Sequence, residues 1–260
     1  MQPQPLESRR NARVQAFCRL RDSAGARRDA GRFVLEGLRL CADCVETGGT
    51  LSALYVTKTA LDKGGARMDA LLSGAKEVFL ISDPVAEKLS DTVTTQGVFA
   101  EVPFPKTRPF APAAGERYLA LDAVQNPQNL GAAARTAEAL GLTGILLFGG
   151  CDRFSPKALR ASMGALLRLP VWEAASVSET LAAAARVLPV FAAVPDKTAL
   201  PVQQADFSGG AVVVVGNEAN GVRPETLECA RRLTVPMAGR AESLNAAAAA
   251  AILIWEMVRA

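Results

Sequence analysis

The sequence contains no histidine among its 260 residues. Histidine is the commonest general base, the usual partner of a nucleophilic serine and a frequent zinc ligand. Its absence excludes serine–histidine catalysis and most zinc sites with mixed ligands. Any chemistry must therefore rest on carboxylates, amides, hydroxyls, arginine, lysine or cysteine.

Cysteine is sparse and apolar runs are short. The five cysteines are irregularly spaced, and the C-x-x-C pair at Cys41 and Cys44 has no second pair, so we expect buried free thiols in a reducing cytosol and no metal site. The longest apolar stretch, residues 246–255, is too short to span a bilayer, and the polar start of the chain shows no signal peptide. We expect a cytoplasmic protein without a membrane partner.

Positive charge is concentrated at the start of the chain, although the net charge is only +3. Residues 1–32 hold a cluster of arginines against only Glu7, Asp22 and Asp29. A cluster of this kind indicates a nucleic-acid partner, and a solvated charged face is the alternative.

The hydrophobic pattern predicts two α/β domains joined by a linker. Residues 1–102 alternate helices with short apolar strands and include a basic helix over residues 8–21. Residues 103–116 carry four prolines and little periodicity, which is typical of an interdomain linker. Residues 117–260 alternate continuous apolar strands with helices, one of them at about residues 157–167. This pattern predicts a parallel sheet covered by helices on both faces.

Three polar loops follow strands of the second domain, and in parallel α/β sheets ligands bind beyond the carboxyl ends of the strands. The first loop leads into a predicted helix, with Asn129 just before the helix and Arg135 well inside it. A helix cap at Asn129 and a surface pair between Arg135 and Glu138 explain these residues as well as a functional role does.

The second loop is G-N-E-A-N-G at residues 216–221, where two glycines flank Glu218 and leave backbone groups available to a ligand. A tight strand-to-helix turn is the alternative, and the loop matches neither a dinucleotide nor a P-loop fingerprint. The third loop, residues 236–245, is long and ends at Ser243 and Asn245 before an alanine-rich helix. Capping of that helix is the alternative to a functional role.

The three loops together carry motifs in a fixed order: N-x-G-A-x-x-R at 129–135, G-N-E-x-x-G at 216–221 and P-M…S-L-N at 236–245. This ordered set resembles the SpoU (TrmH-like) RNA ribose methyltransferases of the SPOUT superfamily. Residues 155–171 are similar to a further stretch of that family. The first domain, with "FVLEGLRL" and "LSDTVTTQGVFAEV", is similar to the family's accessory RNA-binding domain, which is related to a ribosomal protein. The resemblance covers nearly the whole chain.

The resemblance implies an S-adenosylmethionine-dependent enzyme that methylates a ribose 2′-OH, with large-subunit ribosomal RNA as the expected substrate. It implies a trefoil knot in the C-terminal domain, an exception to the rule that chains do not thread loops, and a homodimer that completes the active site across its interface. The cofactor-binding positions that it implies are Gly216, Val235, Met237, Leu244 and, at the border, Val194. The implied catalytic and substrate-orienting residues are Asn129, Arg135, Glu218, Ser243 and Asn245. The RNA-binding residues expected from the basic cluster and the resemblance are Arg9, Arg10, Arg13, Arg28, Lys157 and Arg160.

Arg135 has two possible roles in such an enzyme. A guanidinium is always protonated, so we interpret it as a clamp on the neighbouring phosphate and a stabiliser of the developing alkoxide rather than as a base. Two other functions stay open: a ribose methyltransferase acting on transfer RNA, and a catalytically silent RNA-binding protein of the same fold. A nicotinamide-dependent oxidoreductase fails for lack of a glycine fingerprint after the first strand.

Overall fold

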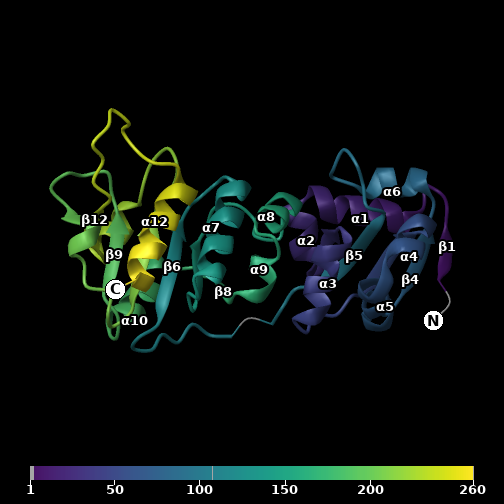
Figure 1. Ribbon diagram of the computed structural model, residues 1–260, viewed down its shortest axis with the longest axis horizontal. Coiled ribbons are helices and arrows are strands. Elements are labelled where there is room, and N and C mark those ends of the chain that lie inside the picture. The colour runs from purple at the N-terminus through teal and green to yellow at the C-terminus, as the bar shows by residue number, and fades with distance from the viewer. Residues whose placement is uncertain (1–2, 107, 260) are drawn as a thin grey trace. The chain divides into compact units, whose positions relative to one another are not determined.

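The computed structural model describes residues 3–106 and 108–259, which divide into two compact units (Figure 1). The first unit holds the described residues up to Lys106 together with Phe154–Arg160, and the second holds the other described residues. Each unit is an α/β structure with its own sheet and its own core.

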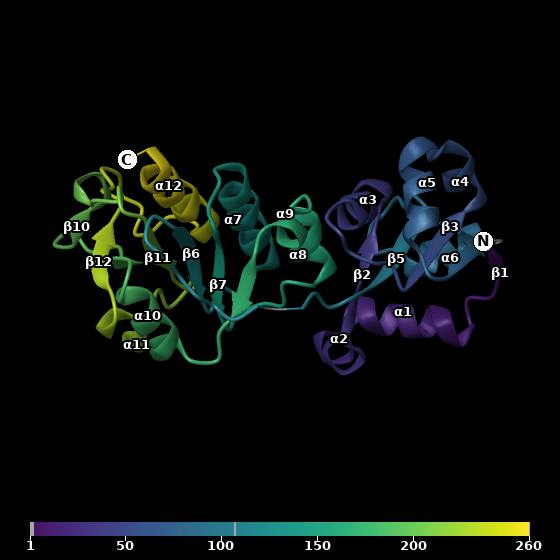
Figure 2. The same ribbon diagram turned by 90° about the horizontal axis from the view of Figure 1, so that it is seen from below.

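The first unit is a five-stranded mixed sheet in the order β1-β4-β3-β5-β2, in which β5 runs antiparallel to both of its neighbours. Helices α1 and α3 lie on opposite sides of this sheet (Figure 2). The strands are β1 (Gln4–Leu6), β2 (Arg32–Glu36), β3 (Ala53–Thr57), β4 (Val78–Ile81) and β5 (Val98–Pro103). The helices are α1 (Ala12–Asp22), α2 (Ala24–Ala30), α3 (Leu38–Glu46), α4 (Lys58–Lys63), α5 (Gly65–Gly74) and α6 (Asp83–Leu89).

The basic helix expected at residues 8–21 is α1, which begins at Ala12. Its start is set by Asn11, whose side chain accepts a hydrogen bond from the Arg13 N–H at 2.8 Å, as a helix cap does. The apolar face of α1 buries Phe17 edge-on against Tyr55 and Phe99 of the sheet. Arg13 and Arg19 of this helix are exposed, as expected for the polar face of an amphipathic helix, whereas the Arg21 side chain is only 16% exposed.

Residues Phe154–Arg160 pack within the first unit although they follow β7 of the second in sequence. Phe154 is buried and stacks on Phe33 and Phe104 at ring distances of 4.5 and 4.6 Å. The helix expected at residues 157–167 is accordingly two short helices, α8 (Pro156–Ala161) and α9 (Ala165–Arg168). The break falls at Met163 and Gly164, which both have positive φ.

The second unit is a seven-stranded sheet in the order β10-β12-β9-β11-β6-β7-β8, and every pair of neighbouring strands is parallel. The strands are β6 (Arg117–Asp122), β7 (Gly144–Phe148), β8 (Val171–Glu173), β9 (Val190–Ala193), β10 (Leu200–Pro201), β11 (Ala211–Val215) and β12 (Arg231–Thr234). The further helices are α7 (Pro127–Ala139), α10 (Val177–Ala185), the 3₁₀ turn Val202–Gln204, α11 (Pro224–Glu228) and α12 (Ala246–Arg259).

Helices cover both faces of this sheet. Figure 2 shows α7 and α12 on one side and α10 and α11 on the other. Strands β7 and β11 are buried at all five positions, which explains their continuous apolar sequences, whereas β8, β10 and β12 are partly exposed. The expected α/β class, with a helix-covered parallel sheet and a second, smaller α/β unit, is confirmed.

Candidate active site

Three predicted site residues meet through hydrogen bonds at the carboxyl edge of the parallel sheet. The Asn129 side-chain amide donates to the Glu218 carboxylate at 2.7 Å, and the Asn245 amide donates to the Asn129 Oδ1 at 3.0 Å. Glu218 follows β11, Asn129 lies in α7 after β6, and Asn245 precedes α12. Because β11 and β6 are parallel neighbours, their following loops meet at one edge. We call Glu218, Asn129 and Asn245 the carboxylate–amide chain.

The position of Asn129 differs from the prediction that placed it just before the helix. The helix α7 begins at Pro127, and its cap is Asn126, whose side chain accepts the Gln128 N–H at 2.9 Å. Proline at the first helical position after an Asn cap is a known helix start. Asn129 is therefore inside the first turn and buried, and its side chain is available to Glu218 instead of capping.

The capping interpretation of Asn245 is correct, and it coexists with the contact to Asn129. The Asn245 Oδ1 accepts hydrogen bonds from the N–H groups of Ala247 and Ala248 at 2.9 and 3.3 Å. The same side chain uses its Nδ2 for Asn129. One residue thus fixes the start of α12 with its acceptor and the orientation of Asn129 with its donor.

Glu218 is held as a carboxylate. Burial, the largest single influence on it, opposes ionisation, but the hydrogen bonds from Asn129 and from backbone N–H groups, those of Gln125 and Asn126 among them, outweigh burial and lower the pKa below its usual value. A carboxyl group with a lowered pKa is a weak proton acceptor at neutral pH. Glu218 can therefore anchor and orient other groups, but it is poorly suited to act as a general base.

The loop that carries Glu218 is closed on itself. The backbone N–H and C=O groups of Asn217 and Gly221 exchange hydrogen bonds of 2.9 Å, and the Asn217 Nδ2 donates to the Ala123 carbonyl at 2.8 Å. A Cβ on Gly216 would lie 2.2 Å from the Gly221 carbonyl carbon. Gly216 is therefore required for the close backbone approach that shapes this loop.

A cavity of about 500 Å³ lies beside this loop, and its walls come from the ends of β9, β11 and β12 and from the segment before α12. All five predicted cofactor-binding residues line it: Val194, Gly216, Val235, Met237 and Leu244. Glu218 and Ser243 of the predicted catalytic set line it as well. The volume is that of a small-molecule site, which is about 300–1,000 Å³, and most of the wall is apolar or backbone.

Arg135 and Ser243 stand apart from the carboxylate–amide chain. Both are exposed, and among the described residues neither side chain has a hydrogen bond or an ion pair. Arg135 is six residues beyond Asn129 on α7, which at 3.6 residues per turn is about one and two-thirds turns. The two side chains therefore leave the helix on different sides. The alternative interpretation, in which Arg135 is a surface residue paired with Glu138, does not hold, because Glu138 pairs with Arg168.

The six residues predicted to contact RNA fall into two groups in the first unit. Three of them are ion-paired to carboxylates within the unit: Arg9 to Glu87, Arg13 to Glu77 and Arg160 to Asp91. The other three, Arg10, Arg28 and Lys157, are exposed, and in the described part of the chain they have no ion pair. Their charges are thus free to meet phosphate groups.

Sequence reasoning missed a polar cluster at the same sheet edge. Asp122, fully buried at the end of β6, accepts hydrogen bonds from the Arg223 N–H and Nε and from the Thr226 hydroxyl. Arg223 also donates to the Phe148 carbonyl at the end of β7. The cluster ties the loop after β11 to the neighbouring strands. The sequence feature that could have indicated this cluster is Asp122, the last residue of an apolar strand, because a buried charge at such a position is stable only when it is paired.

The part of the chain that the structure describes provides neither a metal-binding cluster nor a membrane-spanning helix. Its residues contain no group of three or more His, Cys, Asp or Glu side chains that could hold a metal ion. No helix within residues 3–106 or 108–259 is long and apolar enough to cross a membrane.

Comparison with known proteins identifies the family. The model of the SpoU rRNA methylase family matches residues 116–255, and that of the MRM3-like substrate binding domain matches residues 11–100. The chain therefore belongs to the SpoU rRNA methylase family, and it is a methyltransferase of that class.

Individual relatives match the chain over different lengths. The 23S rRNA (guanosine(2553)-2′-O)-methyltransferase RlmP of Bacillus subtilis is 31% identical over 97% of this chain and 98% of its own. An AdoMet-bound rRNA methyltransferase from Sinorhizobium meliloti superimposes with a TM-score of 0.88 at 27% identity, covering 100% of this chain and 98% of its own. A structure described as giving insights into the 2-OH methylation of C/U34 on tRNA is 32% identical with a TM-score of 0.51, covering 55% of this chain and 95% of its own.

The two roles of the Asn245 side chain, capping α12 and donating to Asn129, can be separated by substitution. We expect Asn245→Asp to keep the α12 cap, because a carboxylate accepts the same N–H groups, but to lose the donor to Asn129 and to slow methyl transfer about tenfold. Asn245→Ala is expected to lose both contacts, with a further loss of about 1 kcal/mol in the free energy of unfolding. Urea denaturation and single-turnover methylation measure the two effects. A wild-type rate for Asn245→Asp contradicts this assignment.

Proposed function

We propose that the protein transfers a methyl group from S-adenosylmethionine to a ribose 2′-OH of large-subunit ribosomal RNA. The observation that carries the proposal is the convergence of three sequence motifs on one cavity at the edge of a parallel sheet. Family membership and full-length relatives named for 23S rRNA support it. The cofactor and the reaction agree with the absence of histidine, because methyl transfer from a sulfonium needs no metal and no nucleophilic enzyme side chain.

The cavity fits the cofactor in size and in chemistry. Apolar side chains of Val194, Met237 and Leu244 would hold its less polar parts, and the strand-end backbone at Gly216 and Val235 would hold its polar edges. When bound, S-adenosylmethionine supplies an electrophilic methyl group. Ser243 and Glu218 lie at the same cavity wall, so the reacting ribose would be placed between the cofactor site and the carboxylate–amide chain.

The residues of this chain act by positioning and by electrostatics. The carboxylate–amide chain holds Asn129 in one orientation, and Asn129 and Ser243 orient the ribose so that its 2′-oxygen lies in line for transfer. Arg135 binds the adjacent phosphate through its guanidinium and stabilises negative charge as it develops on the 2′-oxygen. The hydroxyl proton leaves to water, because neither Arg135 nor the ionised Glu218 is a suitable acceptor.

A homodimer explains how Arg135 joins this site. Arg135 is exposed and leaves α7 on a different side from Asn129, so a second copy would bring its own Arg135 to this cavity. An apolar stripe on α12 supports the dimer: Ala248, Ile252 and Trp255 are exposed on successive turns, and Trp255 is 54% exposed. Exposed apolar side chains grouped on one helix face are typical of a protein interface.

We expect Trp255→Arg to prevent dimer formation at micromolar concentration, because it places a charge in the proposed apolar interface. Methyl transfer should fall with the dimer. Analytical ultracentrifugation and a methylation assay at the same concentration measure both. Val187→Arg is the matched control, since Val187 is also exposed, at 46%, but follows α10 on the other side of the sheet. A monomeric but fully active Trp255→Arg variant would exclude the shared site.

We propose that residues 1–102 form the domain that binds the RNA. Residues 103–116 would be the linker, and residues 117–260 the methyltransferase domain. The match of residues 11–100 to a substrate binding domain supports this division. We also propose that the segment before α12 is threaded as a trefoil knot, as the family resemblance implies. A cytoplasmic location stays a prediction.

Ribosomal RNA is favoured over transfer RNA because the full-length relative is named for rRNA, whereas the tRNA-directed structure matches only 55% of the chain. Methyl-labelled cofactor incubated with large-subunit rRNA, small-subunit rRNA and bulk tRNA, each lacking modifications, tests the choice. Label in large-subunit rRNA alone is the expected result. Label in tRNA alone would favour the tRNA alternative, and no label in any RNA would favour a catalytically silent RNA-binding protein.

A further inference from the structure

The loop between α6 and β5 in the first unit is fixed at its base by one carboxylate. Glu36, at the end of β2, accepts hydrogen bonds from the Ser90 and Thr92 hydroxyls at 2.5 and 2.8 Å and from the Asp91 N–H at 2.9 Å. Gln96, near the other end of the loop, accepts the Leu38 N–H at the start of α3 at 3.1 Å. Residues 90–96 are therefore held from both ends, and we call them the α6–β5 loop.

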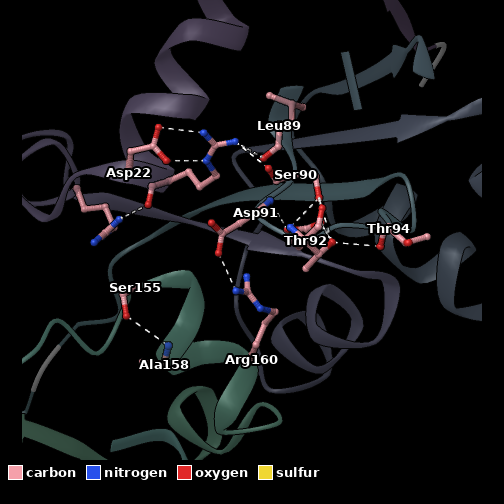
Figure 3. A network of polar contacts seen from close by, with 12 residues as sticks. Asp22, Leu89, Ser90, Asp91, Thr92, Thr94, Ser155, Ala158 and Arg160 are labelled. Carbon is pink, nitrogen blue, oxygen red and sulfur yellow. Dashed lines mark hydrogen bonds and ion pairs between the residues drawn. The ribbon is translucent and has the colours of Figure 1, made fainter. Parts of the chain in front are cut away.

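Two arginines that are distant from the α6–β5 loop in sequence form hydrogen bonds with the base of this loop (Figure 3). The Arg21 Nη1 donates to the carbonyls of Leu89 and Ser90 at 3.2 and 2.9 Å. Arg160, from the segment that packs into this unit, donates to the Asp91 carboxylate at 2.7 Å. The Arg160 Nη1 is buried, so this guanidinium is turned into the structure rather than presented to a ligand.

The tip of the loop carries the most exposed large apolar side chain among the described residues. Val93 is exposed to its full extent, at 107% of its reference area, between the polar residues Thr92 and Thr94. An apolar side chain in this position has no packing role in the unit. Because the base of the loop is already fixed, less conformational entropy is lost when the exposed tip binds a partner.

Charge near the loop favours a polyanionic partner. The exposed Lys88 lies at its base together with Arg21, which pairs with Asp22, and the exposed Arg10, Arg28 and Lys157 belong to the same unit. Cationic groups around an exposed apolar contact match RNA, whose phosphates bind arginine and lysine and whose unstacked bases bind apolar and aromatic side chains.

We propose that the α6–β5 loop contacts the RNA substrate through Val93 and that Arg160 is a positioning residue for this loop. The inference rests on the proposed function, because it names the part of the protein that recognises the RNA. It also changes the role of Arg160: its ion pair with Asp91 fixes the loop, and the phosphate contacts fall to the unpaired cations.

Val93→Asp tests the contact at the loop tip. It places a negative charge against RNA at a fully exposed position, so folding is unaffected, while the KM for large-subunit rRNA rises about tenfold or more and kcat changes by less than twofold. The matched control is Val187→Asp in the second unit, which is exposed and should leave KM unchanged. An unchanged KM for Val93→Asp overturns the proposal.

Arg160→Gln and Asp91→Asn test the positioning role. Each single variant should raise KM for rRNA by about fivefold to tenfold with kcat kept, and the double variant should be no worse than either, because both remove the same ion pair. Arg160→Lys should recover part of the affinity. Additive effects, or a loss confined to kcat, would overturn the role.

Direct RNA binding separates this inference from the proposed function. Filter binding of an in vitro transcript of large-subunit rRNA is measured for the wild type, Val93→Asp and Val187→Asp. If the wild type binds the transcript but transfers no methyl group, the proposed function fails, and the loop is still judged by whether Val93→Asp weakens binding. If methyl transfer occurs and Val93→Asp binds as the wild type does, only the inference about the loop fails.

Discussion

Replacing Arg135 with alanine is expected to lower the rate of methyl transfer about 100- to 1,000-fold, the usual effect of removing one preorganised group that stabilises transition-state charge. The affinity for S-adenosylmethionine should change by less than twofold, because Arg135 does not line the cavity of the predicted cofactor residues. Folding should be unaffected, since the side chain is exposed and makes no hydrogen bond among the described residues. Single-turnover methylation and calorimetric cofactor titration measure the two quantities.

Arg186→Ala is the matched control for this experiment. Arg186 is also an exposed arginine, at the end of α10, and has no ion pair within the described residues. Figure 2 shows α10 on the opposite side of the sheet from α7. We expect the control to keep the wild-type rate. If Arg135→Ala binds cofactor and RNA normally and also methylates at the wild-type rate, the proposed electrostatic role of Arg135 is wrong.

The second large effect is expected from Gly216→Ala. The added methyl group would lie 2.2–2.4 Å from backbone atoms of Gly221 and Val222, so the closed loop must move. We expect a loss of about 1–3 kcal/mol in the free energy of unfolding and a fall of at least tenfold in affinity for S-adenosylmethionine, because the displaced backbone forms part of the cavity wall. Thermal unfolding with and without cofactor measures both.

The control for this substitution is Gly209→Ala. A Cβ at Gly209 meets no atom within 4 Å, and its φ is not positive, so the same added methyl group should change neither stability nor cofactor affinity appreciably. Cofactor affinity that is unchanged in Gly216→Ala, together with lowered stability, would show that the loop supports the fold alone. That result would remove Gly216 from the proposed cofactor site.

Much of the second unit could be predicted from the sequence because strands such as β7 and β11 are buried at every position. Continuous apolar runs such as residues 211–215 have no other stable placement in a domain of this size. Once those strands are parallel, the loops after them must share one edge, so three separate motifs could be assigned to one site. The five cofactor positions themselves came from the family resemblance, and all five lie in the wall of the cavity.

The contacts inside the site were harder to predict. Asn129 looked like a helix cap, but the Asn126–Pro127 pair starts α7 earlier and turns Asn129 inward to Glu218. Hydrogen-bond partners depend on such shifts of one turn, and helix ends are the least certain part of any sequence-based assignment. The placement of Arg135 relative to the proposed second copy could not be predicted, because hydrophobic periodicity within one chain does not define contacts between two chains.

The segment Phe154–Arg160 shows a second reason why sequence-based prediction falls short. The sequence predicts one helix over residues 157–167, since its apolar residues follow helical spacing. The structure divides it at Met163 and Gly164, which have positive φ, and the segment packs through Phe154 on Phe33 and Phe104 and through Arg160 on Asp91. These partners are separated from the segment by about 50 to 120 positions in the chain. Local pattern gives no information about contacts at that separation.

Methylation of a ribose in large-subunit rRNA can be established by nucleoside analysis of the product. Unmodified large-subunit rRNA is incubated with the protein and methyl-labelled S-adenosylmethionine, digested completely to nucleosides and separated by chromatography. We expect label in a single 2′-O-methylnucleoside and loss of that label with the Arg135→Ala variant. Label on a base, or no label in large-subunit rRNA, would contradict it.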